Sequence, residues 1–308
     1  MSSAPPLTRR APSTAPASGV PAPALVLAAI ISVQSGSAVA RLLFDRLPAT
    51  AVVFLRLLSA AVLLAALTRP RVWTWPASTI RAALALGITM SVMNLAFYES
   101  LRTVPLGVAV TVEFCGPLLL ALVQTRRAVD LVWALCAAAG VAMLGLGGHL
   151  SAPLHGLLLA FLAGVCWAGY ILTSARVGAA LPGSGGLAVS LVVGTALAAS
   201  VTAVRAPGSF GTAFGDPALL GRGLAVGLLS SLVPYTLEMS ALRRLPTRVF
   251  GVLMSLEPLA ATVAGLVILG QRPEAREAVA LVLVSVASVG ITLAARSPAP
   301  SPPLPKAG

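Results

Sequence analysis

The chain has 308 residues, of which 57% are hydrophobic and only 10% are charged. A soluble domain usually carries about 25% charged residues, so the composition excludes an ordinary soluble protein and indicates an integral membrane protein. The net charge of +12 arises from single arginines and short arginine pairs between apolar runs, which is typical of anchors for membrane helices. Because no long basic block is present, we expect no nucleic-acid partner.

Apolar runs follow one another along the chain, and runs of about 18 residues or more can cross a bilayer as helices. Proline-rich segments at residues 1–22 and 296–308 favour disordered tails. Between the tails we expect an all-α fold of ten transmembrane helices, over residues 24–43, 50–68, 80–100, 105–125, 129–147, 155–175, 186–204, 219–241, 246–269 and 274–295.

The first apolar run has a second interpretation. Two arginines precede it at residues 9–10, and Ala-Val-Ala at residues 38–40 resembles the cleavage site of a signal peptide. Polar residues such as Gln34 interrupt the run, which favours a permanent membrane helix instead.

The loop charges predict the orientation. If the N-terminus is inside, thirteen of the 21 lysines and arginines lie on the inner side and seven on the outer side, with Arg56 inside a span. Positive charge is enriched on the cytoplasmic side of membrane proteins. We therefore expect both termini in the cytoplasm.

A sequence repeat divides the chain into two halves. LRTVPLGVAVTVEFCGPLLL, which starts at Leu101, aligns without a gap with LRRLPTRVFGVLMSLEPLAA, which starts at Leu242. Two prolines recur within it at an offset of 141 positions, Pro105 with Pro246 and Pro117 with Pro258.

We therefore predict two five-helix repeats, at residues 23–148 and 153–295. Because five is odd, the second repeat must enter the membrane from the opposite side. Inverted repeats are typical of secondary transporters, whose substrate site lies near the midplane between the repeats. The alternative is a duplication that only builds a stable bundle.

An acid and a helix breaker occur together in the fourth span. Pro117 cannot donate a hydrogen bond to the carbonyl of Glu113, four residues earlier. Gly116 allows another backbone or a ligand to approach closely. This arrangement favours binding of an ammonium group, because intramembrane ionisable residues usually face a cavity. The alternative is a structural pair between Glu113 and an arginine.

Arg56, in the second span, could pair with Glu113, bind a substrate carboxylate or extend toward the outer interface. In the ninth span Pro258 is equivalent to Pro117, whereas Glu257 aligns with Gly116 and not with Glu113. A role in function and a structural pair are both open for Glu257. The remaining candidates for substrate binding are polar or aromatic side chains within the spans: Gln34, Asn94, Phe97, Tyr98, Trp167, Tyr170, Tyr235, Glu238 and Ser255.

Other classes of site find little support. The three cysteines form no CxxC pair, and the two histidines flank a short turn, so we expect no metal site and no cofactor. An intramembrane enzyme would need a nucleophile with a base, and no histidine lies within a span. A dyad of Glu113 with Glu257 is the one enzymatic arrangement left open.

Two segments resemble a known family. NLAFYESLRTVPLGVAVTVEFCGPLLLAL (94–122) and PYTLEMSALRRLPTRVFGVLMSLEPLAATVAGLVILGQ (234–271) are similar to the EamA family of the drug/metabolite transporter superfamily, and within it to the threonine/homoserine exporter branch. The family usually has an acid where this chain has Gln271. The resemblance implies ten helices in two inverted halves and a multi-pass protein of the bacterial cytoplasmic membrane.

These features predict a secondary transporter that exports small amino acids or related metabolites by alternating access. Glu113 would hold the ammonium group of the substrate and could exchange a proton for it, while Arg56 or a helix N-terminus would hold the carboxylate. Export of another metabolite or drug is the nearest alternative. A non-transporting membrane scaffold is the alternative from another class, and it predicts a dry interior without a cavity.

Overall fold

A computed structural model describes residues 20–125, 128–145, 152–181, 183–242 and 244–294. These residues form helices joined by short turns, and they contain no strand. The expected all-helical fold is therefore confirmed. The expected tails lie almost entirely outside the described residues.

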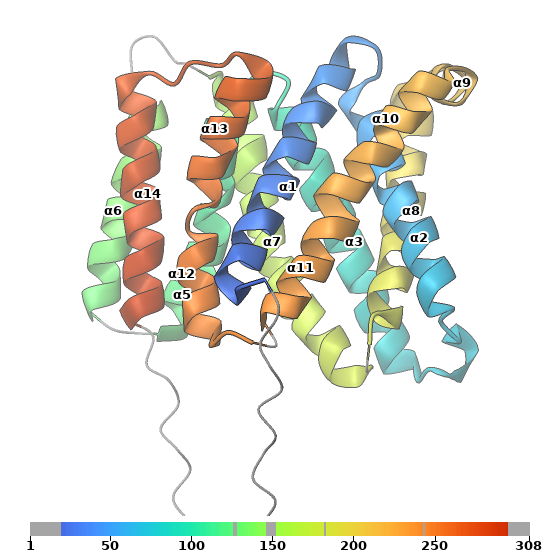
Figure 1. Cartoon of the computed structure of the whole chain (residues 1–308), viewed down its shortest axis with the longest axis horizontal. Helices are drawn as coiled ribbons and strands as arrows, with labels where there is room; N and C mark the ends of the chain where they lie inside the picture. Colours follow the sequence, from blue (N-terminus) through green and yellow to red (C-terminus); the bar gives the residue numbers. More distant parts are fainter. Residues whose placement is uncertain (1–19, 126–127, 146–151, 182, 243, 295–308) are drawn as a thin grey trace, which may run out of the picture.

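The first half of the chain carries six α-helices, coloured blue to green in Figure 1. Their bounds are α1 Ala22–Leu42, α2 Ala49–Thr68, α3 Ala77–Ser100, α4 Leu106–Glu113, α5 Cys115–Thr125 and α6 Ala128–Gly145, with short 3-10 turns η1 Leu43–Asp45 and η2 Val72–Thr74.

The second half carries eight α-helices and one π-helical turn. Their bounds are α7 Leu154–Ala180, α8 Gly185–Arg205, α9 Ser209–Gly215, α10 Pro217–Gly227, η3 Leu228–Leu232, α11 Val233–Leu242, α12 Thr247–Met254, α13 Glu257–Leu269 and α14 Ala275–Ala294.

Proline marks the start of many of these helices. α1, α2, α3, α4, α7 and α12 each begin directly after a proline. The first N–H groups of a helix have no partner within it, so a residue without an N–H loses nothing there. The turns between the spans thus follow directly from the sequence.

Nine helical segments of the described residues are long and apolar enough to cross a membrane. They coincide with nine of the ten expected spans. The fifth expected span, 129–147, coincides with α6, whose described apolar stretch, Leu131–Leu144, is shorter. A multi-pass membrane protein is therefore confirmed, and the tenth span stays a prediction.

Three of the spans are interrupted. The fourth is broken between α4 and α5 at Phe114, and the ninth between α12 and α13 at Ser255 and Leu256. In the eighth, the π-helical turn η3 joins α10 to α11. Interrupted helices expose backbone groups, and membrane proteins tolerate these where they are packed against protein or line a cavity.

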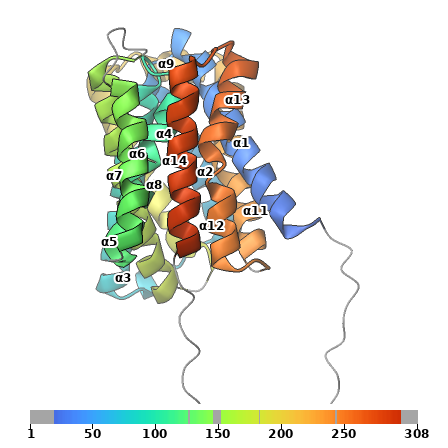
Figure 2. The same ribbon diagram turned by 90° about the vertical axis from the view of Figure 1, so that its left-hand side faces the viewer.

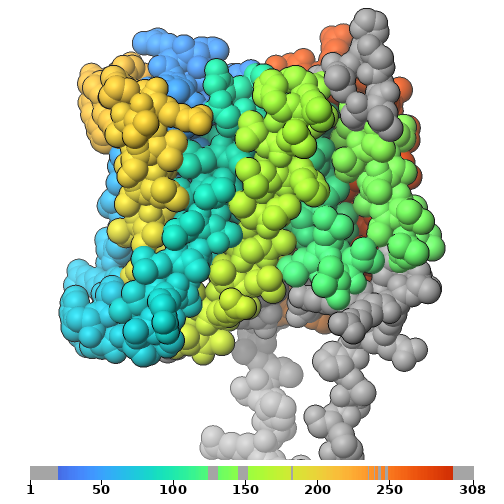
Figure 3. Space-filling model, turned by 180° about the vertical axis from the view of Figure 1, so that it is seen from behind, coloured from blue at the N-terminus to red at the C-terminus, as the bar shows by residue number. Residues whose placement is uncertain are grey.

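The helices pack as one bundle. α3 packs against α7 and α8, α2 against α8, α1 against α11 and α13, and α6 against α14, which lie side by side in Figure 2. Viewed from behind, α8, α3 and α7 form a row across the surface (Figure 3). Large apolar side chains on the outside, such as Val204 at 84% and Val267 at 75% exposure, fit contact with lipid.

Candidate functional site

A central cavity of about 400 Å³ lies between the two halves of the chain. It is lined by residues of α1, α2, α3, α4 and α5 from the first half and by residues of α7, η3, α11, α12, α13 and α14 from the second half. The scaffold alternative predicted an interior without such a cavity. Its presence between the halves argues against that alternative.

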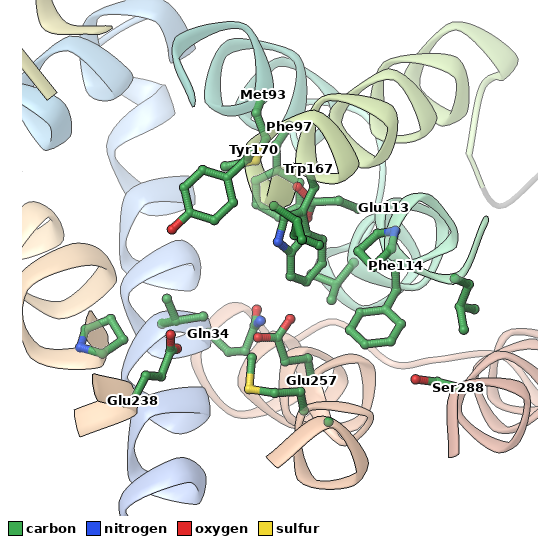
Figure 4. A pocket seen from close by; sticks show the side chains of 18 of the residues that line it. Gln34, Met93, Phe97, Glu113, Phe114, Trp167, Tyr170, Glu238, Glu257 and Ser288 are labelled. Atoms are coloured by element: carbon green, nitrogen blue, oxygen red, sulfur yellow. The ribbon is translucent and has the colours of Figure 1, made fainter. Parts of the chain in front are cut away.

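Most of the predicted site residues face this cavity. Nine of the candidates for substrate binding and one helix-break residue line it, as Figure 4 shows for several of them: Gln34, Arg56, Asn94, Phe97, Glu113, Trp167, Tyr170, Glu238, Glu257 and Pro117. The remaining residues are placed differently. Tyr98, Ser255, Gly116 and Pro258 do not line the cavity, and the side chain of Tyr235 lies outside the described residues.

The break beside Glu113 is packed against α7. A methyl group on Gly116 would overlap the carbonyl of Gly164, and one on Gly164 would overlap the carbonyl of Glu113. Of the two partners that Gly116 could admit, the structure shows another backbone, that of Gly164. The backbone of α7 therefore lies against the Glu113 carbonyl, and binding of an ammonium group at this position stays a prediction. The half-buried side chain of Glu113 remains on the cavity wall.

The second break presents Glu257 to the cavity. Glu257 begins α13 and is 6% exposed, and Figure 4 shows it across the cavity from Glu113. Ser255 is fully buried behind the wall, where its hydroxyl lies 2.6 Å from the hydroxyl of Ser288. It is Ser288, on α14, that lines the cavity.

Arg56 is fixed inside the bundle. Its Nη1 donates to the hydroxyl of Tyr98 at 2.9 Å, and its Nη2 donates to the carbonyl of Ser230 at 3.0 Å. Two ion pairs occur among the described residues, Arg46–Asp216 and Arg102–Glu99, and neither involves a residue of the cavity. The pair of Arg56 with Glu113 is therefore not formed in this structure, and the guanidinium does not extend to the outer interface.

Aromatic and amide side chains complete the walls. The rings of Phe114 and Trp167 meet edge to face with centroids 5.4 Å apart. Asn94 donates to the carbonyl of Met90 on its own helix at 2.8 Å. Gln34 is 4% exposed, and its side-chain oxygen has no hydrogen-bond partner among the described residues.

The sequence analysis missed several cavity residues. Ser288 and Thr292 lie four residues apart on α14 and so share one helix face, a signal that could have found them. Ser230 lies four residues before Pro234, and the rule applied to Pro117 would also have identified it. Met93 and Met254 carry no such signal, because methionine is ordinary in any apolar span.

Comparison with known proteins identifies the fold and the family. Residues 154–293 match the EamA-like transporter family. The threonine/homoserine exporter RhtA of Salmonella typhimurium (strain LT2) is 41% identical over 274 residues, which cover 88% of this chain and 91% of that protein. RhtA of Escherichia coli (strain K12) is 39% identical over the same coverage. The chain belongs to the EamA-like transporter family.

A solved crystal structure supports the fold of this EamA-like transporter. It superposes with a TM-score of 0.61 over 88% of this chain and 96% of the other, at 19% sequence identity. The family membership also decides the class of activity. The protein is a membrane transporter of a small molecule and not an enzyme, so the dyad of Glu113 with Glu257 is not a catalytic pair.

Proposed function

We propose that this protein exports small amino acids such as threonine and homoserine from the bacterial cytoplasm by alternating access. One observation carries the proposal: one cavity is lined by three acids and by Arg56, the one cation among the described residues that line it. An amino acid carries an ammonium group and a carboxylate, so it needs both signs of charge. The relatives that are named threonine/homoserine exporters support this substrate class.

In this proposal the ten spans form two inverted repeats, with α6 as the fifth span. The equivalent helices α4 and α12 support this arrangement, because each has eight residues. Their first residues, Leu106 and Thr247, are 141 positions apart, and so are their last residues, Glu113 and Met254. Both helices follow a proline and both precede a break. Local structure is thus repeated along with the sequence.

The packing supports the same symmetry. An inverted repeat relates each span of the first half to the one five places later, so the contact of α3 with α7 should recur as a contact of α11 with α1. Likewise, the contact of α5 with α7 should recur between α13 and α1. Both pairs of contacts occur in the bundle.

The cavity extends toward the end of the bundle where α1 begins and α14 ends (Figure 1), along α5, α12 and the last turns of α14. At the other end, α4 packs against α13. The excess of arginine and lysine supports a cytoplasmic location for the open end. The substrate would enter there and leave after α4 and α13 separate.

Glu113 and Glu257 come from different halves of the chain. A movement of one half relative to the other would therefore change the distance between these two acids. We assign the ammonium group of the substrate to this acidic side and a proton to Glu113 when the substrate has left. Among the described residues that line the cavity, the other charged groups are Glu238, Glu257 and Arg56.

Export from cells tests the proposal. Cells with and without the protein are loaded with labelled threonine, homoserine and a wider metabolite panel, and loss of label is followed. Faster loss of the two amino acids, abolished by Glu113→Ala, is the expected result. If both amino acids are retained equally while another metabolite is lost, the substrate class is wrong although the protein is a transporter.

A further inference from the structure

We propose that Arg56 forms a carboxylate subsite in the central cavity and that Tyr98 is the residue that positions it. The inference rests on the proposed function in one respect, since an exported amino acid would supply the carboxylate. It adds a requirement: the transported molecule must carry a free carboxylate at a fixed place in the cavity.

The hydrogen-bond donors of Arg56 can be counted. An arginine side chain has five N–H groups, one on Nε and two on each terminal nitrogen. Nη1 uses one on Tyr98 at 2.9 Å, Nη2 uses one on the Ser230 carbonyl at 3.0 Å, and Nε uses its own on the Ser231 hydroxyl at 3.5 Å. Among the described residues, the second N–H of each terminal nitrogen has no hydrogen-bond partner. Two parallel N–H groups are what a carboxylate accepts in a bidentate pair.

The sequence explains why the carbonyl of Ser230 is available to Arg56. In an α-helix this carbonyl would accept from the residue four positions later, which is Pro234 and has no N–H. Ser230 also lies in the π-helical turn η3, and π turns inside helices are frequent at functional sites. Arg56 supplies the missing hydrogen bond from a different helix.

A glycine brings the two segments together. Gly227, just before η3, lies against α2, where an added methyl group would stand 2.7 Å from the backbone oxygen of Arg56. The hydroxyl of Ser59 donates to that same oxygen at 2.8 Å. The backbone at Arg56 is therefore held on both sides, and the side chain starts from a fixed position.

Tyr98 acts through Arg56. Its side chain is fully buried and does not line the cavity, so it cannot touch a substrate there. Its hydroxyl accepts from Nη1, and the guanidinium carbon lies 5.3 Å from the centre of its ring. Such cation–π contacts strengthen when water is excluded. Tyr98 thereby fixes the plane of the guanidinium.

The surroundings of Arg56 contain a further polar group. Ser230 is 2% exposed and lines the cavity, and its hydroxyl has no hydrogen-bond partner among the described residues. Buried hydroxyl groups are rarely left unpaired. The oxygen of this hydroxyl lies against Gly36 of α1. The carboxylate is therefore assigned to Arg56 alone, while the ammonium group of the same molecule would face the acids of the cavity.

Ligand binding to the purified full-length protein tests the subsite. The probes are threonine, threonine amide, which lacks the carboxylate, and 3-hydroxybutyrate, which lacks the ammonium group. The variants are Tyr98→Phe and Arg56→Lys, and Thr89→Val is the control, because the Thr89 hydroxyl on α3 bonds only to its own helix at Ala85. Ligand-dependent thermal stabilisation gives the affinity of each protein variant for each probe.

We expect the wild type to bind threonine more tightly than threonine amide. Tyr98→Phe should lower the affinity for threonine and for 3-hydroxybutyrate by about tenfold, since a hydrogen bond to a charged group is lost. The same variant should leave threonine amide nearly unchanged. Arg56→Lys keeps the charge but not the two parallel donors, so it should weaken both carboxylates at least as strongly. Thr89→Val should match the wild type.

If the role of Tyr98 is purely structural, Tyr98→Phe will lower the affinity for threonine and for threonine amide by the same factor. That result would overturn the proposal. So would a wild type that does not distinguish the two compounds, or that binds no carboxylate in the panel. If Tyr98→Phe fails to fold, the affinities of the wild type and of Arg56→Lys for the three probes still test the carboxylate subsite. If cells export neither threonine nor homoserine while 3-hydroxybutyrate binding depends on Arg56, the proposed substrates are wrong and the subsite stands.

Discussion

The side-chain oxygen of Gln271 accepts a hydrogen bond from the backbone N–H of Leu106 at 3.0 Å. Leu106 is the first residue of α4, where N–H groups lack helical partners, and Gln271 follows the end of α13. Nearby, a methyl group on Gly107 would overlap the hydroxyl of Thr262. The two broken spans are therefore joined tightly at one end of the central cavity.

We expect Gln271→Leu to open this end more often. Loss of one hydrogen bond costs about 1 kcal/mol, which raises the open population roughly fivefold. The measurement is the labelling rate of Thr262→Cys with a membrane-impermeant maleimide, after the three native cysteines are replaced by alanine. Gln271→Glu keeps an acceptor oxygen and should label at the parent rate. Equal labelling rates for the two variants would show that the hydrogen bond between Gln271 and Leu106 does not hold this end closed.

The second prediction concerns Glu113. If a proton from outside replaces the departing substrate on this acid, export should be faster in a more acidic medium. Glu113→Gln cannot exchange a proton, so export of labelled threonine should become slower and independent of external pH. Glu99→Gln is the control, because Glu99 pairs with Arg102 away from the cavity. An unchanged pH profile in Glu113→Gln would remove the proton from the mechanism.

The close approach of α5 and α7 gives the third prediction. Gly116→Ala should lower the melting temperature of the purified protein, because its methyl group would overlap the carbonyl of Gly164. Overpacking of this kind costs roughly 1–3 kcal/mol. The matched control is Gly178→Ala on α7, where nothing lies within 4 Å of the added methyl group. Equal melting temperatures for the two variants would show that α5 and α7 are free to separate.

The fourth prediction separates the wall of the cavity from its support. Ser288 lines the cavity, whereas its partner Ser255 is buried behind it. Ser255→Ala should lower stability by about 1 kcal/mol and change the half-saturating threonine concentration little, since Ser288 can still face the substrate. Thermal unfolding and export are measured together. A larger change in threonine affinity for Ser255→Ala than for Ser288→Ala would assign the contact to Ser255 instead.

The positions of helices and breaks could be predicted from the sequence because they depend on local chemistry. Apolar runs of sufficient length, most of them preceded by a proline, predicted nine spans that the structure contains. The breaks after Glu113 and Met254 recur at the offset of 141 that the sequence repeat had shown. A proline acts on the carbonyl four residues before it, so this information lies within one turn of helix.

The contacts of the site could not be predicted in the same way. The sequence placed Glu113 and Arg56 inside spans, yet it left open whether they pair. In the structure Arg56 binds Tyr98 and Ser230, and α7 covers the Glu113 carbonyl. These contacts join helices that are far apart in the sequence.

The sequence by itself determined the membrane class and nine of the spans, because hydropathy and proline act within short segments. The motifs at residues 94–122 and 234–271 indicated the family. Only the tertiary structure decided which groups remain available to a ligand. Packing of α2 against η3 and α3 uses three donors of Arg56, and packing of α4 against α7 brings Gly164 against the Glu113 carbonyl. Which donors and acceptors are free depends on the neighbouring helix.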